Sequence, residues 1–258
     1  MTARPATTIA SLLAAALLAG GCGPTFSEVT IETPIQAKLD VSAFQRVLVA
    51  GFITGGTEDV DANLETVRLL RSQLRTKSGV RVIEADILPL QEVAREQSSD
   101  TADADAPAEG ADPERIRDDR DLAPYERLFA NVDYWKRIGE EYQGPLIVTG
   151  TVLFTPHQRS GFVTREEEVF DSAGRRRVIP VRTYQERKGY ILRPKFIFID
   201  GRTGATLYTE SFREEILYNA SQNTPALSSY FELMDRLVPN FLNTLSTQKI
   251  RGTRVLLR

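Results

Sequence analysis

The segment PLIVTGTVLFT occupies residues 145–155 and is almost entirely apolar and β-branched. A run of this kind, bounded by turn residues, predicts a β-strand. A shorter run, RVLVAGF at residues 46–52, is bounded by Arg46 and by a cluster of glycine and threonine. Because this second run has no polar alternation, it predicts a buried central strand.

Helical spacing follows the shorter run and returns later in the chain. Apolar residues recur every three or four positions from Val60 to Leu74, and Gly79 stands where a helix would end, which predicts a helix of about 18 residues. Residues 89–96 and 131–142 predict two further helices, the second with Asn131 as its N-cap. The apolar pattern of residues 227–245 predicts a C-terminal helix.

Further strands are predicted at residues 80–85, 161–170, 175–184, 188–200 and 205–212, and turn residues separate the last four into two hairpins. This order of elements predicts an α/β (α+β) fold, a mixed β-sheet with helices packed on one face of it. We expect a single domain over residues 44–250, followed by a C-terminal tail or edge strand at 251–258.

An acidic segment interrupts the domain. From Glu96 to Asp121 there are ten acidic residues, three arginines and no aromatic residue. Such a composition cannot bury enough apolar surface to offset the entropy lost on ordering. Residues 97–122 are therefore predicted to form a disordered acidic insertion on the surface.

The amino-terminal segment predicts export. Arg4 precedes an apolar run of about 13 residues, shorter than the ~20 that span a bilayer, and the run ends in LAGG just before Cys22. This junction resembles the lipobox of bacterial lipoproteins, with Ala19 where leucine is usual. The resemblance implies a signal peptide at 1–21, thioether lipidation of Cys22, a tether at 22–43 and anchorage in the membrane through lipid. Since Gly23 is not aspartate, we expect sorting to the outer membrane, facing the periplasm.

Three segments together resemble a known family: RVLVAGF with the following helix, NVDYWKRIGEEYQGPLIVTGTV, and the hairpin YILRPKFIFIDGRTGATLYTESF. They are similar to the periplasmic core shared by the curli secretion lipoprotein CsgG and the penicillin-binding-protein activator LpoB. The match is strongest where a strand ends at Asp200 and the turn Arg202-Thr203-Gly204 leads into the next strand. The resemblance implies a cell-envelope module that binds partners or assembles without doing chemistry.

The charged hairpin is the candidate partner surface. Glu166 and Glu168 precede, and Arg175 and Arg177 follow, the turn residues 171–174. A two-residue turn would place Glu168 opposite Arg177, with Glu166 and Arg175 on the same face. This arrangement predicts either a solvated, ion-paired hairpin or a docking surface for a protein or an anionic glycan. Both faces carry charge, which speaks against insertion into a membrane.

The sequence contains only weak patterns of catalytic, cofactor-binding or metal-binding residues. His157 is the only histidine and Cys22 the only cysteine. The glycines at 51, 55 and 56 match no phosphate-binding spacing, and the acidic residues that follow would repel an anion. We therefore expect no enzyme activity, no cofactor, no metal and no nucleic acid, and expect a protein partner or self-assembly in the envelope. Two alternatives stay open: a component of an oligomeric outer-membrane export channel, and a hydrolase or ligand-binding receptor.

Overall fold

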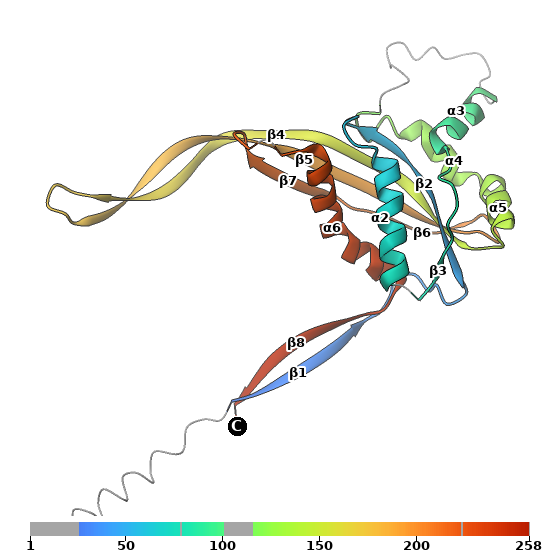
Figure 1. The fold of residues 1–258 in the computed structure, drawn as a ribbon, viewed down its shortest axis with the longest axis horizontal. Coiled ribbons are helices and arrows are strands. Elements are labelled where there is room, and N and C mark those ends of the chain that lie inside the picture. Colours follow the sequence, from blue (N-terminus) through green and yellow to red (C-terminus); the bar gives the residue numbers. More distant parts are fainter. Residues whose placement is uncertain (1–25, 78, 101–115, 223, 258) are drawn as a thin grey trace, which may run out of the picture. The chain divides into compact units, whose positions relative to one another are not determined.

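The computed structural model describes residues 26–77, 79–100, 116–222 and 224–257 (Figure 1). Cys22 and the signal-peptide prediction lie outside these residues. Within them the elements are β1 (Phe26–Ile35), β2 (Arg46–Gly56), α2 (Ala62–Lys77), β3 (Arg81–Val82), α3 (Leu90–Asp100), the 3-10 helix η2 (Ala123–Tyr125), α4 (Glu126–Ala130), α5 (Val132–Glu141), β4 (Leu146–Phe170), β5 (Arg176–Asp200), β6 (Thr206–Ser211), β7 (Glu214–Asn219), α6 (Ala226–Leu245) and β8 (Gln248–Leu257).

Residues 37–246 form one compact unit, built on a mixed sheet. The strand order is β3-β2-β4-β5-β6, and β7 pairs with another part of β5. Strand β2 runs parallel to both β3 and β4, whereas β4 with β5, and β5 with β6 and β7, are antiparallel. The predicted fold class, an α/β domain with a mixed sheet, is confirmed.

Helices cover both faces of this sheet, so the prediction of helices on one face is wrong. On one face Val47, Val49 and Phe52 share a core with α2 and α6. On the other face Leu48 and Ile53 share a core with α3, α4 and α5. The physical reason lies in the continuous apolar run of β2, because a strand without polar alternation has two faces to bury.

Local signals in the sequence explain several element ends. The Asn131 side chain accepts a hydrogen bond from the backbone N–H of Tyr134, which confirms it as the N-cap of α5. In β2 the register shifts between Val49 and Gly51, and Gly51 has a φ of 142°, a conformation that favours glycine. The Arg71 guanidinium donates to the Val49 carbonyl at this bulge, and so joins α2 to the sheet.

The acidic insertion differs from the prediction at both of its ends. Residues 97–100 belong to α3, and the side chains of Ile116 and Leu122 are buried beside β2 and α4. These are the segment's isolated large apolar residues, and burying them offsets the cost of ordering the chain around them. The remaining part, residues 101–115, lies outside the described residues.

A second unit contains the described residues 26–36 and 247–257. In its described part β1 and β8 form an antiparallel two-stranded ribbon, with Phe26 opposite Leu257 and Ile35 opposite Gln248. Arg251 and Glu32 form an ion pair across it at 2.7 Å. The segment expected to be a tether thus contains strand β1. The carboxyl-terminal residues, expected to be a tail or an edge strand, form strand β8, because the backbone N–H and C=O groups of β1 and β8 pair with each other.

Candidate functional site: the β4–β5 arm

Strands β4 and β5 are each 25 residues long, and each strand has a buried half and an exposed half. Strand β4 is buried from Leu146 to Phe154, where it pairs with β2, and is exposed from Gln158 onward. Residues 158–186, here called the arm, continue as a ribbon in which β4 and β5 pair with each other (Figure 1). The segments predicted as separate strands at 145–155 and 161–170 therefore form one strand, β4, and those at 175–184 and 188–200 form one strand, β5. The predicted hairpin of 188–200 with 205–212 is present as the β5–β6 pair.

The turn at the end of the arm decides its register. Asp171 and Arg175 lie opposite each other, and Gly174 has a φ of 73°. The loop therefore has three residues with a left-handed glycine last, where the sequence analysis assumed two. The Asp171 side chain accepts hydrogen bonds from the N–H groups of Arg175 and Ala173, and these bonds, that from Arg175 most of all, lower its pKa against the opposing effect of desolvation.

This extra residue corrects the predicted partner surface. Glu168 lies opposite Val178 and Glu166 opposite Pro180, whereas Arg177 lies opposite Val169 on the other face. A register slip of one residue moves a side chain to the other face of a ribbon. Arg175 bonds to Asp171 within the turn, and the ion pair of Glu168 is made by Arg176 at 3.1 Å. The four predicted residues do not form one surface.

The structure reveals an aromatic group on the arm that the sequence analysis did not single out. Phe162 and Tyr184 lie opposite each other and make an edge-to-face contact with ring centroids 5.3 Å apart. The Arg182 guanidinium lies 4.5 Å above the Phe162 ring, a cation–π geometry. Phe162 is 62% exposed, Tyr184 58% and Phe170 70%. Period-2 alternation with the correct turn length would have placed these rings on one face.

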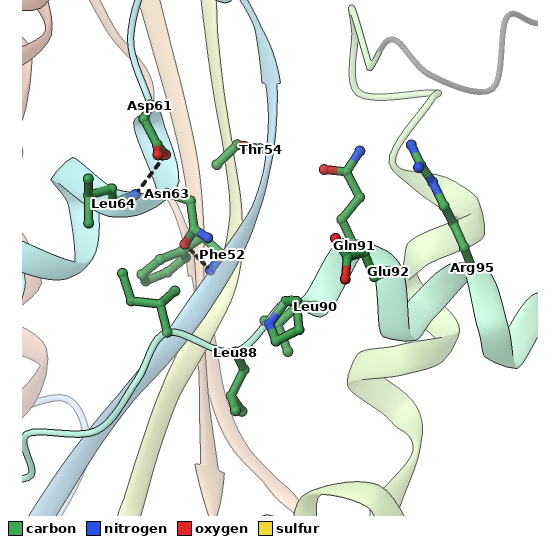
Figure 2. Close-up of a pocket in the computed structure, with 12 residues that line it drawn as sticks. Phe52, Thr54, Asp61, Asn63, Leu64, Leu88, Leu90, Gln91, Glu92 and Arg95 are labelled. Atoms are coloured by element: carbon green, nitrogen blue, oxygen red, sulfur yellow. Dashed lines mark hydrogen bonds between the residues drawn. The ribbon is translucent and has the colours of Figure 1, made fainter.

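A pocket of about 570 Å³ lies beside β2 at the first turns of α2 and α3 (Figure 2). The Asp61 carboxylate accepts the N–H of Leu64, and the Asn63 side chain accepts the N–H of Phe52. These two side chains hold the start of α2 against β2. The adjacent glycine at 56 donates its N–H to the carbonyl of Ile116, which also covers Gly55, so this turn does not present a phosphate cradle.

His157 lies on β4 at the base of the arm. Its Nε2 is 3.5 Å from a carboxylate oxygen of Glu215, and the ring lines a groove of about 630 Å³ together with Tyr190 and Tyr218. Across the described residues, no group of three or more His, Cys, Asp and Glu side chains is arranged to hold a metal ion. None of the helices that the structure describes has the length and apolarity needed to cross a membrane.

Comparisons with known proteins give distant structural neighbours. No protein-family model and no curated protein matches the chain. A lipoprotein of Neisseria meningitidis aligns with 77% of this chain and 98% of its own, at 11% identity and a TM-score of 0.34. A neuraminyllactose-binding hemagglutinin homolog from Helicobacter pylori covers 80% of this chain and 82% of its own, at 10% identity and a TM-score of 0.34.

A PDZ domain protein from Parabacteroides distasonis covers 95% of this chain and 42% of its own length, at 9% identity and a TM-score of 0.24. The comparisons do not confirm the resemblance to the CsgG and LpoB family, which stays a prediction. At these identities and TM-scores, the function has to be inferred from this chain's own residues.

Proposed function

We propose that this chain is a lipid-anchored bacterial cell-envelope protein whose α/β body carries the arm as a non-catalytic protein-binding element. The observation that carries the proposal is the arm itself. Large apolar residues such as Phe162 and Phe170 are exposed to solvent on the arm, although the sheet has a hydrophobic core on each face in which such side chains are buried. Exposed aromatic residues that gather on one element are typical of a binding surface.

The partner class follows from backbone chemistry. An open strand edge presents N–H and C=O groups that another polypeptide strand can satisfy, and the side chains beside it then provide specificity. Burying the exposed rings of Phe162 and Tyr184 under a partner would add apolar area at roughly 25 cal/mol per Å². A protein that offers an extended segment fits this surface.

Photo-crosslinking in cell envelopes tests the binding role. A photoreactive amino acid at Phe162 should capture a partner, whereas the same group at Val132, which is 48% exposed on α5, should not. A variant in which residues 160–186 are replaced by Asn-Gly lacks position 162, so its binding is measured by co-purification of the partner captured by the wild type, which should be lost. Equal capture from both positions, or unchanged binding without the arm, would contradict the proposal.

The anchor is tested separately. We propose that Cys22 is acylated and that the chain resides in the outer membrane, in keeping with the lipobox-like junction and with glycine at position 23. Metabolic labelling with a fatty-acid analogue should label the wild type and not Cys22→Ser, and membrane fractionation should place the label in the outer membrane. An unlabelled wild type would exclude the lipid anchor.

A further inference from the structure

The two outer edges of the arm are not equivalent. Strand β5 is covered by β7 from Arg187 to Leu192, and farther out it contains Pro180, which has no backbone N–H to donate. Strand β4 last pairs with β2 at Phe154, and among the described residues no strand pairs with the outer edge of β4 from 155 to 170. Residues 157–170 of that edge contain no proline. The β4 edge is therefore the one open to strand addition.

Charge is distributed along this edge in a self-complementary way. Arg159 lies near the base of the arm, and Arg165 lies in the half nearer the turn, directly before Glu166, Glu167 and Glu168; all five are exposed. An identical strand added in the antiparallel direction would bring Arg159 of one copy to the acidic residues of the other. Opposite charges directly across a strand pair stabilise it, and like charges destabilise it.

The charges also select a register. Two identical antiparallel strands are related by a two-fold axis, so one residue lies opposite itself. With Val163 on the axis, Arg159 faces Glu167 twice by symmetry, and no like charges are opposed from 156 to 170. With Phe162 on the axis, Arg159 would face Arg165 instead. With Thr164 on the axis, neither arginine would face a glutamate.

The centre of this register is apolar. Phe162 and Val163 are 62% and 42% exposed, on opposite faces of the ribbon, and both would gain a neighbouring strand. Building on the protein-binding role proposed above, we propose that the partner of the β4 edge is a second copy of this chain. The two β4 edges pair antiparallel around Val163 and join the two arms into one sheet of order β5-β4-β4-β5.

Disulfide crosslinking of the full-length lipidated chain in isolated envelopes tests this pairing. Directly opposed residues of antiparallel strands have Cα atoms about 4.5 to 5.5 Å apart, within the ~4.4 to 6.8 Å that a disulfide bridges. Val163→Cys should therefore give a disulfide-linked dimer on mild oxidation. Val181→Cys lies on the same face but on β5, one strand away from the interface on each side, and serves as the control that stays monomeric.

Charge reversal tests the register. In the Val163→Cys background, Arg159→Glu and Glu167→Arg should each abolish the linked dimer, and the double variant should restore it. Arg182→Glu, which changes charge on β5, should leave the dimer in place. Mixing the two single-reversal chains should also restore it, since one copy then supplies both glutamates and the other both arginines.

The outcomes separate this inference from the proposed function. A Val163→Cys chain that stays monomeric, or that links no better than Val181→Cys, overturns the pairing of two copies. If the photoreactive group at Phe162 then captures a different protein, the protein-binding role stands without self-association. Failure of the double charge reversal to restore the dimer overturns the register.

Discussion

The backbone N–H of Gly56 donates a 2.8 Å hydrogen bond to the carbonyl oxygen of Ile116. The Ile116 side chain packs so closely over the neighbouring Gly55 that a β-carbon added there would meet it at 2.5 Å. Ile116 is thus bonded to the end of β2, and Ile116 and Leu122 belong to the core, whereas residues 117–121 between them are exposed.

Truncating Ile116 should destabilise the body. Ile116 is 5% exposed, and removing a buried isoleucine side chain down to alanine costs ~2 to 5 kcal/mol. Chemical denaturation of Ile116→Ala should report a loss of this size in the free energy of unfolding. Ile179→Ala is the matched control, because Ile179 is 41% exposed on the arm. Equal stability of the two variants would contradict the packing described for Ile116.

Phe198 should be indispensable for folding. Its ring is fully buried in the sheet centre, stacked 5.9 Å from Phe241 of α6. Phe→Ala in a core costs ~3 to 5 kcal/mol, a large share of the ~5 to 15 kcal/mol that a domain has. Thermal unfolding of Phe198→Ala should show a large fall in Tm, whereas Phe170→Ala, at a ring that is 70% exposed, should leave Tm nearly unchanged.

Asp200 should make stability depend on pH in the acidic range. Burial by itself would raise its pKa, but the side-chain and backbone hydrogen bonds from Arg202 and the positive charge of Arg202 lower it below the ordinary value of 3.8. A lowered folded-state pKa means that the stabilisation is present above about pH 3.8 and is lost as the pH falls through the folded-state value. Asp200→Asn should therefore be less stable than the wild type at pH 7.

That difference in the free energy of unfolding should shrink as the pH falls below 3.8, because the wild-type carboxylate then also loses its charge. Urea titrations at pH 7 and at low pH measure it. A constant difference between Asp200→Asn and wild type at both pH values would show that the Asp200 charge is not responsible.

The body should fold without the arm. The sheet pairings of β2, β6 and β7 all lie within residues that remain when 160–186 are replaced by Asn-Gly, a dipeptide that favours a tight hairpin between Arg159 and Arg187. Tm should change by only a few degrees, since a shorter surface connection alters closure entropy logarithmically. A shortened chain that unfolds would mean that the arm stabilises the body.

The sequence alone determined the elements whose signals are local. The apolar periodicity of α2, the capping side chain of Asn131 and the continuous runs in β2 and β4 each depend on neighbours a few residues away, so they could be predicted.

Only the tertiary structure decided the features that depend on distant residues or on one exact loop length. The pairing of β1 with β8 joins the two ends of the described chain. The burial of Ile116 depends on the space left by the absent side chain of Gly55, more than fifty residues earlier in the sequence. The register of the arm depends on the loop having three residues, the last of them Gly174. The third residue places Arg177 on the face of the ribbon opposite to that of Glu168. Hydrophobic periodicity fixes which residues a strand buries, whereas turn geometry and long-range packing fix which residues it meets.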